Sequence, residues 1–134
     1  PFIPGKANVM KEGTDVCIIA CGLMIPKALE AAAQLEKEGV SAAVVNMHTI
    51  KPIDKDIVLK MNETCKAIVT VEEHSVIGGL GSAVAEVLAG HDGAKFAMVG
   101  IQDKFGKSGK PDQLFEAYGL TAANVAAKAK ELLK

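Results

Sequence analysis

The sequence contains no arginine, and its 15 basic residues other than histidine are all lysines. Lysine lacks the planar, five-donor fork of a guanidinium group, so this absence argues against a site that grips phosphate or carboxylate in a bidentate way. Positive charge is not in excess either, because the formal net charge is −1. A chain without a basic surplus has no electrostatic footprint for DNA, RNA or an anionic membrane. The composition therefore predicts neither a nucleic-acid partner nor a membrane partner.

Cysteine is scarce, and long apolar runs are missing. Of the three cysteines, Cys17 and Cys21 fall in one predicted strand, which separates them by roughly 13 Å. A disulfide needs Cα atoms within about 7 Å, so this pair is excluded; Cys65 is interpreted as a small buried thiol rather than a reactive one. No run approaches the ~18–20 apolar residues of a membrane span, and no segment resembles a signal peptide. These absences predict a reducing, cytoplasmic compartment.

What the chain does contain is enough apolar material for one folded domain. Its 134 residues are 49% hydrophobic, which is typical of a globular domain with a substantial core. The sequence begins Pro-Phe-Ile-Pro and not with methionine. We therefore expect it to be part of a longer polypeptide, with residues 1–6 as the end of an interdomain linker and residues 7–134 as the domain.

Strand and helix patterns alternate along the chain. Short apolar or β-branched runs predict five strands, at Ala7–Met10, Asp15–Cys21, Ala42–Met47, Ala67–Val71 and Lys95–Gly100. Apolar residues at helical spacing follow most of them, in Ile25–Leu35, in a helix that Asp54 caps, in Leu80–Leu88, in a short helix from Pro111 or Asp112 to Tyr118, and in a last helix that Thr121 caps. This order predicts an α/β fold with a mostly parallel sheet and helices on both faces.

The most informative segment is Ala67–Glu86, AIVTVEEHSVIGGLGSAVAE. A buried strand is followed there by polar residues and then by glycines that lead into a helix. In open α/β sheets, contacts with ligands and partners collect at the carboxyl ends of the strands. We therefore take this segment as the candidate site, either for binding an anion or for an interface. Its residues are Glu73, His74, Gly78, Gly79, Gly81 and Ser82.

Two interpretations of the glycine turn stay open. Free N–H groups at the start of a helix attract an anion, by about 0.3–1 kcal/mol. Alternatively, the glycines let the helix pack closely on the sheet or on a partner. A dinucleotide site is excluded, because Gly79 and Gly81 occupy the first two glycine positions of its fingerprint but Val84 occupies the third.

Several apparent catalytic or metal motifs fail on spacing. Glu72, Glu73 and His74 are consecutive, so their side chains cannot converge as a catalytic triad. Gly100 and the Gly106-Lys107-Ser108 string have five residues between their glycines, whereas a phosphate-binding loop has four. No histidine or cysteine set has the spacing of metal ligands. We therefore predict no catalytic residue and no metal site within this chain, and a solvated Lys51.

Five stretches of the sequence together resemble the C-terminal domain of the transketolase family. They are EEHSVIGGLGSAVAE, PFIPGKANVMKEGTD, NMHTIKPID, IQDKFGKSG and YGLTAANVAAKAKELL, in the segments 72–86, 1–15, 46–54, 101–109 and 118–133. The resemblance implies a three-layer α/β/α sandwich with five strands, of which the first is an antiparallel edge strand. It also implies that residues 7–134 are a C-terminal domain of this type, and that Glu73 and His74 have structural roles toward the rest of the enzyme.

The resemblance further implies an activity. Transketolases move a two-carbon ketol unit between sugar phosphates of the pentose phosphate class, using thiamine diphosphate and magnesium. The family's GDG…N magnesium motif is absent here, and His91-Asp92-Gly93 is the nearest string. We therefore expect this chain to bind no cofactor alone and to support a homodimer and the cofactor-binding domains or subunit of the enzyme. Alternatives are the same domain of a deoxyxylulose-phosphate synthase or of a 2-oxoacid dehydrogenase β subunit, and a free-standing small-anion-binding regulatory module.

Overall fold

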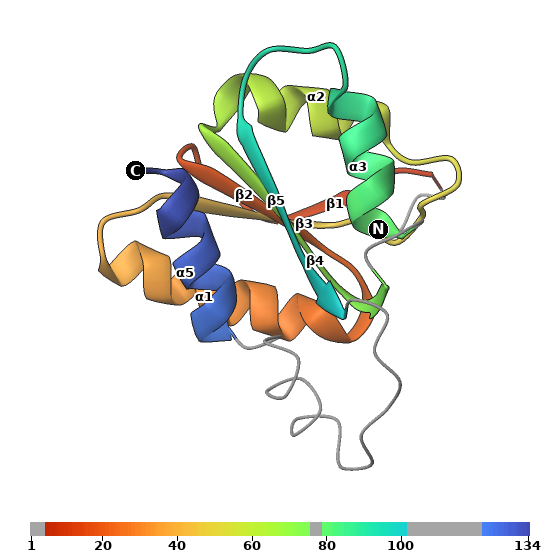
Figure 1. The fold of residues 1–134 in the computed structure, drawn as a ribbon. Helices are drawn as coiled ribbons and strands as arrows, with labels where there is room; N and C mark the ends of the chain where they lie inside the picture. The colour runs from red at the N-terminus through yellow and green to blue at the C-terminus, as the bar shows by residue number, and fades with distance from the viewer. Residues whose placement is uncertain (1–4, 76–78, 102–121) are drawn as a thin grey trace.

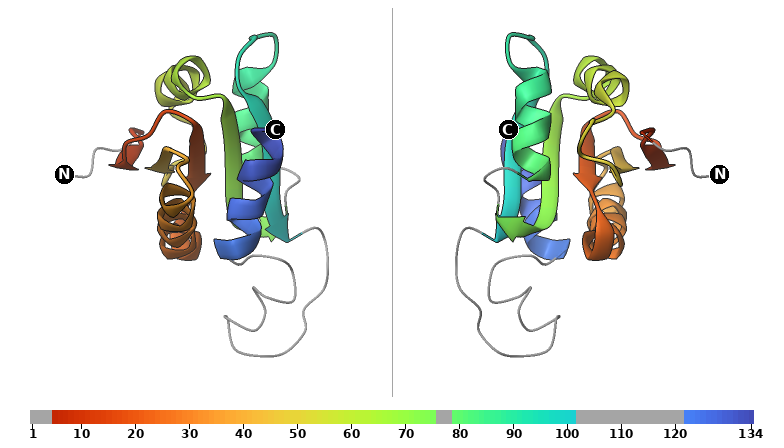
Figure 2. Two further views of the ribbon diagram at one scale, coloured as in Figure 1. Left: turned by 90° about the vertical axis from the view of Figure 1, so that its left-hand side faces the viewer. Right: turned by 90° about the vertical axis from the view of Figure 1, so that its right-hand side faces the viewer.

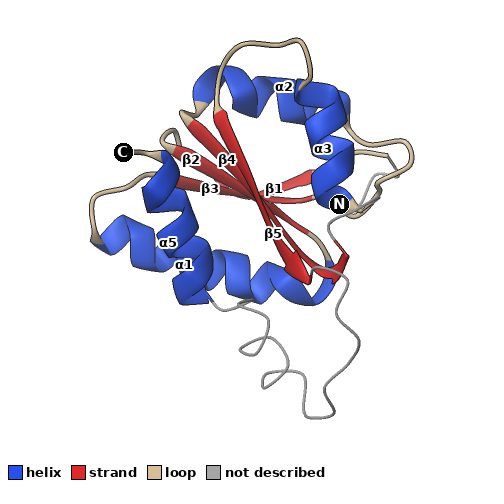
Figure 3. Ribbon diagram, viewed as in Figure 1, coloured by secondary structure: helices blue, strands red, loops and turns tan. Residues whose placement is uncertain are grey.

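The structure, a computed structural model, describes residues 5–75, 79–101 and 122–134. In this part of the chain, a sheet lies between two layers of helices (Figure 1; Figure 3). The strands are β1 (Asn8–Lys11), β2 (Val16–Ala20), β3 (Ala42–Asn46), β4 (Ala67–Ser75) and β5 (Lys95–Ile101). The helices are α1 (Ile25–Lys37), α2 (Lys55–Thr64), α3 (Leu80–Leu88) and α5 (Ala122–Leu132), with a short 3-10 helix at Gly22–Met24.

The strand order in the sheet is β1-β3-β2-β4-β5. β1 pairs antiparallel with β3, whereas β2 pairs in parallel with both β3 and β4, and β5 with β4. Figure 2 shows the sheet from its two faces, with β1 at one side of the sheet and β5 at the other. The three-layer fold with one antiparallel edge strand is confirmed.

The central strand explains why the sheet is covered on both faces. Every residue of β2 is fully buried, as expected for a parallel strand with helices on both sides. Ile18 lies between Val44 of β3 and Val69 of β4 and belongs to the core under α1 and α5. Ile19 belongs to the second core, under α2 and α3. Alternate residues of one strand therefore build two separate cores.

Helix boundaries follow the expected chemistry. α1 ends before Gly39, whose φ of +81° is a left-handed conformation that favours glycine after a helix. The predicted cap of α2 is confirmed, because the Asp54 carboxylate accepts the Ile57 amide at 3.3 Å. Its second oxygen accepts the Ala7 amide at 2.9 Å. Asp54 therefore fixes the start of α2 and the approach to β1 together.

One predicted boundary is wrong. We expected the fourth strand to end at Val71 and to be followed by polar residues outside the strand, but β4 continues to Ser75. The strand goes on pairing with β5 after an irregularity between Val71 and Ser75, so that Ser75 lies opposite Ile101. The polar residues therefore belong to the last part of a strand.

Some predictions fall outside the described residues. They are the short helix from Pro111 or Asp112 to Tyr118, the Thr121 cap, Gly78, and the 102–109 part of the late loop. Within the ranges given above, no helix combines the length and the apolar character that crossing a membrane requires.

Candidate functional site

A buried carboxylate closes the N-terminus of α3. Glu72 of β4 is only 2% exposed. Its Oε1 accepts the Leu80 amide at 3.0 Å, and its Oε2 accepts the Gly81 amide at 2.6 Å. The first amides of a helix have no partner within the helix, and hydrogen bonds from them to an ionised carboxylate are among the stronger ones in proteins. The first amides of α3 are therefore hydrogen-bonded to a carboxylate of the same chain.

This cap bears directly on the anion-binding interpretation of the glycine turn. Two of the amides that an external anion would need already donate to Glu72. Gly79 is the N-cap of α3 and has an extended backbone. The donor set is thus partly used before any ligand arrives, and within the described residues the geometry favours packing over anion binding.

Close packing is seen at Gly81 itself. A Cβ added to this buried residue would lie 2.5 Å from Sδ of Met98 and 3.0 Å from Oγ1 of Thr70. Real Cβ atoms do not approach other atoms so closely, so the first turn of α3 rests closely on β4 and β5, and a side chain at position 81 would require Met98 to move. Glycine at position 81 is favoured by this close approach and not by an unusual backbone angle.

The predicted site residues are only partly brought together. Gly79, Gly81 and Ser82 meet at the start of α3, beside the end of the strand that contains Glu73 and His74. The role of Glu73 and His74 therefore stays a prediction. Glu72 was not among the predicted site residues. Its distance of eight residues from Leu80 matches no local capping pattern, since a capping box spans three residues.

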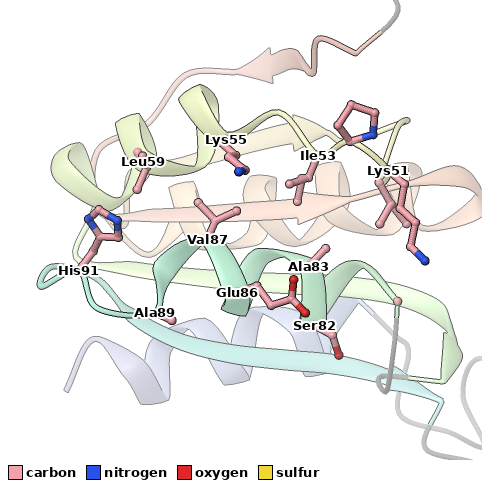
Figure 4. Close-up of a pocket in the computed structure, with 13 residues that line it drawn as sticks. Lys51, Ile53, Lys55, Leu59, Ser82, Ala83, Glu86, Val87, Ala89 and His91 are labelled. Atoms are coloured by element: carbon pink, nitrogen blue, oxygen red, sulfur yellow. The ribbon is translucent and has the colours of Figure 1, made fainter.

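An open groove adjoins this helix entry. It has a volume of about 660 Å³ and lies between α3 on one side and α2 with its preceding loop on the other (Figure 4). Ile53 and Leu59 face it from the α2 side, and Val87 faces it from α3 (Figure 4). The lining residues are Ile50, Lys51, Pro52, Ile53, Lys55, Leu59, Gly79, Ser82, Ala83, Glu86, Val87, Ala89 and His91. The groove is thus mainly apolar with a charged rim.

The charged residues of the rim have opposite signs on the two walls. Lys51 and Lys55 lie on the side of α2 and its preceding loop, whereas Glu86 lies on α3 (Figure 4). His91 lies at one end of the groove and Lys51 at the other (Figure 4). Two lysines on one side of the groove and one glutamate on the other suit a protein surface with a complementary charge pattern. It suits a polyanionic ligand less well, because Glu86 would repel it.

These groups do not fit a magnesium-bound diphosphate. Magnesium takes near-octahedral oxygen ligands, and in the groove a single carboxylate, Glu86, stands opposite two lysines, Lys51 and Lys55, whose positive charges oppose a cation. The oxygens of Glu72 already accept two amides. In the described ranges, no three histidine, cysteine, aspartate or glutamate side chains gather as a metal-ligand set. We therefore derive no chemical step through a cofactor in this domain.

The two buried thiols, Cys17 and Cys65, do not provide a nucleophile either. All three cysteines are free. Burial raises the pKa of the Cys17 thiol well above its usual value, and burial likewise raises the pKa of Cys65. A raised pKa keeps a thiol protonated near neutral pH, and it is the thiolate that attacks. The interpretation of Cys65 as a small buried thiol agrees with its 5% exposure.

The sequence also did not predict that Asn62 holds the loop between α3 and β5. The side chain of Asn62, buried in α2, donates to the Asp92 carbonyl at 2.9 Å and accepts the Ala94 amide at 2.8 Å. It therefore holds the loop between α3 and β5, next to His91 at the end of the groove. The only sequence signal was a polar residue on the inward face of a helix.

Comparison with known proteins gives a consistent pattern. The family model described as the transketolase C-terminal domain matches residues 5–125. A transketolase C-terminal section from Methanocaldococcus jannaschii is 46% identical over 99% of this chain and 42% of that protein. A 6-deoxy-6-sulfo-D-fructose transketolase subunit from a Clostridium species is 45% identical over 98% of this chain and 41% of its own length.

Two further similarities concern a different enzyme and a solved structure. A 1-deoxy-D-xylulose-5-phosphate synthase from Heliobacterium modesticaldum is 45% identical over 96% of this chain and 20% of its own length. The structure of a split-gene transketolase, an inactive β4 tetramer, superposes with a TM-score of 0.93 at 52% identity, over 98% of this chain and 43% of that one. The chain thus spans less than half the length of each of these proteins.

Proposed function

The chain belongs to the transketolase C-terminal domain family, and from this we propose that it is the assembly domain of a split-gene transketolase. The observation that carries the proposal is the 52% identity to a split-gene transketolase along 98% of this chain. The names of two further relatives, a transketolase C-terminal section and a transketolase subunit, agree with it. The complete enzyme would transfer two-carbon ketol units between sugar phosphates.

In this proposal the domain provides a binding surface for the other parts of the enzyme and takes no part in the chemistry. Thiamine diphosphate supplies the carbanion chemistry when it is bound in the rest of the enzyme. This domain supplies none of the cofactor's ligands. It presents the carboxyl end of β4, the start of α3 and the groove as a preformed surface for the cofactor-binding part of the enzyme and for a second copy. Glu73, His74 and Ser82 are proposed as interface residues of that surface.

The rigidity of this surface supports a docking role. Glu72 holds the first amides of α3, and the first turn of the helix packs closely on the sheet at Gly81. A surface that is already ordered loses little conformational freedom when a partner binds. The three free thiols agree with the cytoplasmic, reducing location that we propose.

A second function is favoured by one observation. The identity to a deoxyxylulose-phosphate synthase is 45%, close to that of the transketolase sections. The domain would then have the same assembly role in an enzyme that makes a different product, a deoxyxylulose-phosphate synthase. The small-anion-binding module gains no comparable support, because Glu72 already occupies two of the amides at its proposed site.

Reconstitution separates these possibilities. The chain is mixed with the cofactor-binding part of a transketolase-family enzyme from the same genome, in the presence of thiamine diphosphate and magnesium. We expect ketol transfer from a ketose phosphate to an aldose only when both parts are present. Formation of 1-deoxy-D-xylulose 5-phosphate instead would support the second function. Full activity of the cofactor-binding part without this chain would contradict an assembly role.

A further inference from the structure

One methionine of this chain is exposed and also packs against the start of a helix. Met98 of β5 is 38% exposed, and in the described residues β5 ends the sheet and pairs with β4 alone. Its sulfur nevertheless lies against the first turn of α3, because a Cβ added to Gly81 would fall 2.5 Å from it. A thioether side chain that supports α3 is thus open to solvent.

The other four methionines do not combine these two properties. Met24, Met47 and Met61 are at most 2% exposed, so a dissolved oxidant has little access to them. Met10 is 47% exposed, but it belongs to β1, the strand at the opposite end of the sheet order. Methionine oxidation requires that the oxidant reach the sulfur. Met10 and Met98 are therefore the expected sites, and of these two Met98 is the one that packs at Gly81.

A buried hydroxyl beside the Met98 sulfur has no hydrogen-bond partner. Thr70 of β4 is fully buried, and its Oγ1 is without a partner among the described residues. Buried polar groups are nearly always paired, so an exception calls for a physical explanation. The Cβ position of Gly81 lies 3.0 Å from this Oγ1, so the sulfur and the hydroxyl border the same small region under α3. An oxygen bonded to the sulfur would give the hydroxyl an acceptor.

We propose that Met98 is a site of reversible oxidation, at which a peroxide forms a sulfoxide whose oxygen accepts the Thr70 hydroxyl and displaces the first turn of α3. The sulfur lone pair attacks one peroxide oxygen, the S–O bond forms and the O–O bond breaks. Sulfur loses two electrons, and hydrogen peroxide is reduced to water. Methionine sulfoxide reductases reverse the change. The inference goes beyond the proposed function, because it concerns a covalent change of this chain and holds whichever reaction the enzyme catalyses.

The close packing at Gly81 explains the displacement. A sulfoxide oxygen between Met98 and Thr70 takes the space that a Cβ of residue 81 would need. The bond to Thr70 holds the Met98 side chain there, so the strain is relieved by the helix and not by the methionine. The amides of Leu80 and Gly81 then move away from the Glu72 carboxylate that accepts them. A sulfoxide oxygen that points to solvent leaves α3 in place, so the Thr70 hydroxyl decides between the two outcomes.

Peptide mass mapping tests the oxidation itself. The full chain is treated with hydrogen peroxide, and the gain of one oxygen is followed at each methionine. Met98 and Met10 should be oxidised at least tenfold faster than Met24, Met47 and Met61, and a methionine sulfoxide reductase should reverse the change. Oxidation of Met98 no faster than that of the three buried methionines would overturn the proposal.

Amide hydrogen exchange, followed by NMR, tests the displacement of α3. After oxidation, the amides of Leu80 and Gly81 should exchange at least tenfold faster, because they have lost the Glu72 carboxylate. Met98→Leu is the matched control: it keeps Met10 and all three cysteines, and after the same treatment its exchange should change by less than threefold. The proposal is wrong if oxidised wild type also changes by less than threefold, or if both proteins change equally.

Thr70→Val tests the role of the hydroxyl. Valine has nearly the same shape, and the hydroxyl that it removes is without a partner in the described part of the chain. Before oxidation, exchange in this variant should therefore stay within threefold of wild type. Met98 should still be oxidised, but its sulfoxide lacks the donor that draws it under α3, so exchange at Leu80 and Gly81 should rise by less than threefold. A tenfold rise in oxidised Thr70→Val would contradict the proposed hydrogen bond.

Discussion

Replacing Glu72 with alanine is expected to lower the free energy of unfolding by about 3 kcal/mol, because a buried donor left without a partner costs about 1–3 kcal/mol. The variant leaves two such donors, the amides of Leu80 and Gly81. It also removes the negative charge at the N-terminus of α3. Urea denaturation followed by circular dichroism, at one fixed protein concentration, measures the loss.

Two further variants make this result specific. Glu72→Gln keeps one carbonyl oxygen as an acceptor, so its loss should be about half as large. Glu63 lies exposed on α2, and Glu63→Ala should change stability by no more than about 0.5 kcal/mol. If Glu72→Ala were as stable as Glu63→Ala, the carboxylate would not hold the entry of α3.

Replacing Gly81 with valine is the second change with a large expected effect. Its Cβ would fall 2.5 Å from Sδ of Met98 and 3.0 Å from Oγ1 of Thr70, and the two methyl groups need further space. Overpacking of this kind costs about 1–3 kcal/mol, and α3 must shift outward to relieve it. We therefore expect a lower free energy of unfolding for Gly81→Val.

The two side chains nearest to Gly81, Met98 and Thr70, suggest the control variants. Met98 is 38% exposed and flexible, so it can move aside, whereas Thr70 is fully buried. Gly81→Ala should therefore be milder than Gly81→Val, particularly since alanine favours helix by about 1 kcal/mol over glycine. Adding Met98→Ala should recover part of the loss in Gly81→Val. Wild-type stability of Gly81→Val, measured by urea denaturation, would show that α3 does not rest on the sheet as described.

The fold was largely predictable because its central strands are buried on both faces. A run such as Val16–Ala20 is apolar without alternation, which identifies a central parallel strand. The Asp54 cap was predictable for a similar reason, because capping acts over three residues of sequence. The antiparallel direction of β1 was not available from periodicity, and it came from the family resemblance.

The end of β4 shows where local patterns fail. Glu72, Glu73 and His74 are polar, and polar residues after an apolar run usually indicate a turn. Here pairing with β5 continues to Ser75, and tertiary context overrides local preference. The burial of Glu72 depends on the amides of α3, which come eight residues later. No single position in the sequence contains that information.

The groove was also beyond sequence reasoning. Ile53 and Leu59 belong to one stretch of chain and Val87 to another, and only packing of α2 beside α3 brings them together. Lys51 was interpreted from the sequence as a solvated lysine, and the structure places it at the rim of this groove. The facing charges of Lys55 and Glu86 gain meaning only after the two helices are placed.

The central claim is that this domain assembles the enzyme and contributes no cofactor site. Calorimetric titration of thiamine diphosphate with magnesium tests it most directly, first into the chain alone and then into its equimolar mixture with the cofactor-binding part of the enzyme. We expect no binding heat from the chain alone and stoichiometric binding by the mixture. Stoichiometric binding by the chain alone would contradict the account.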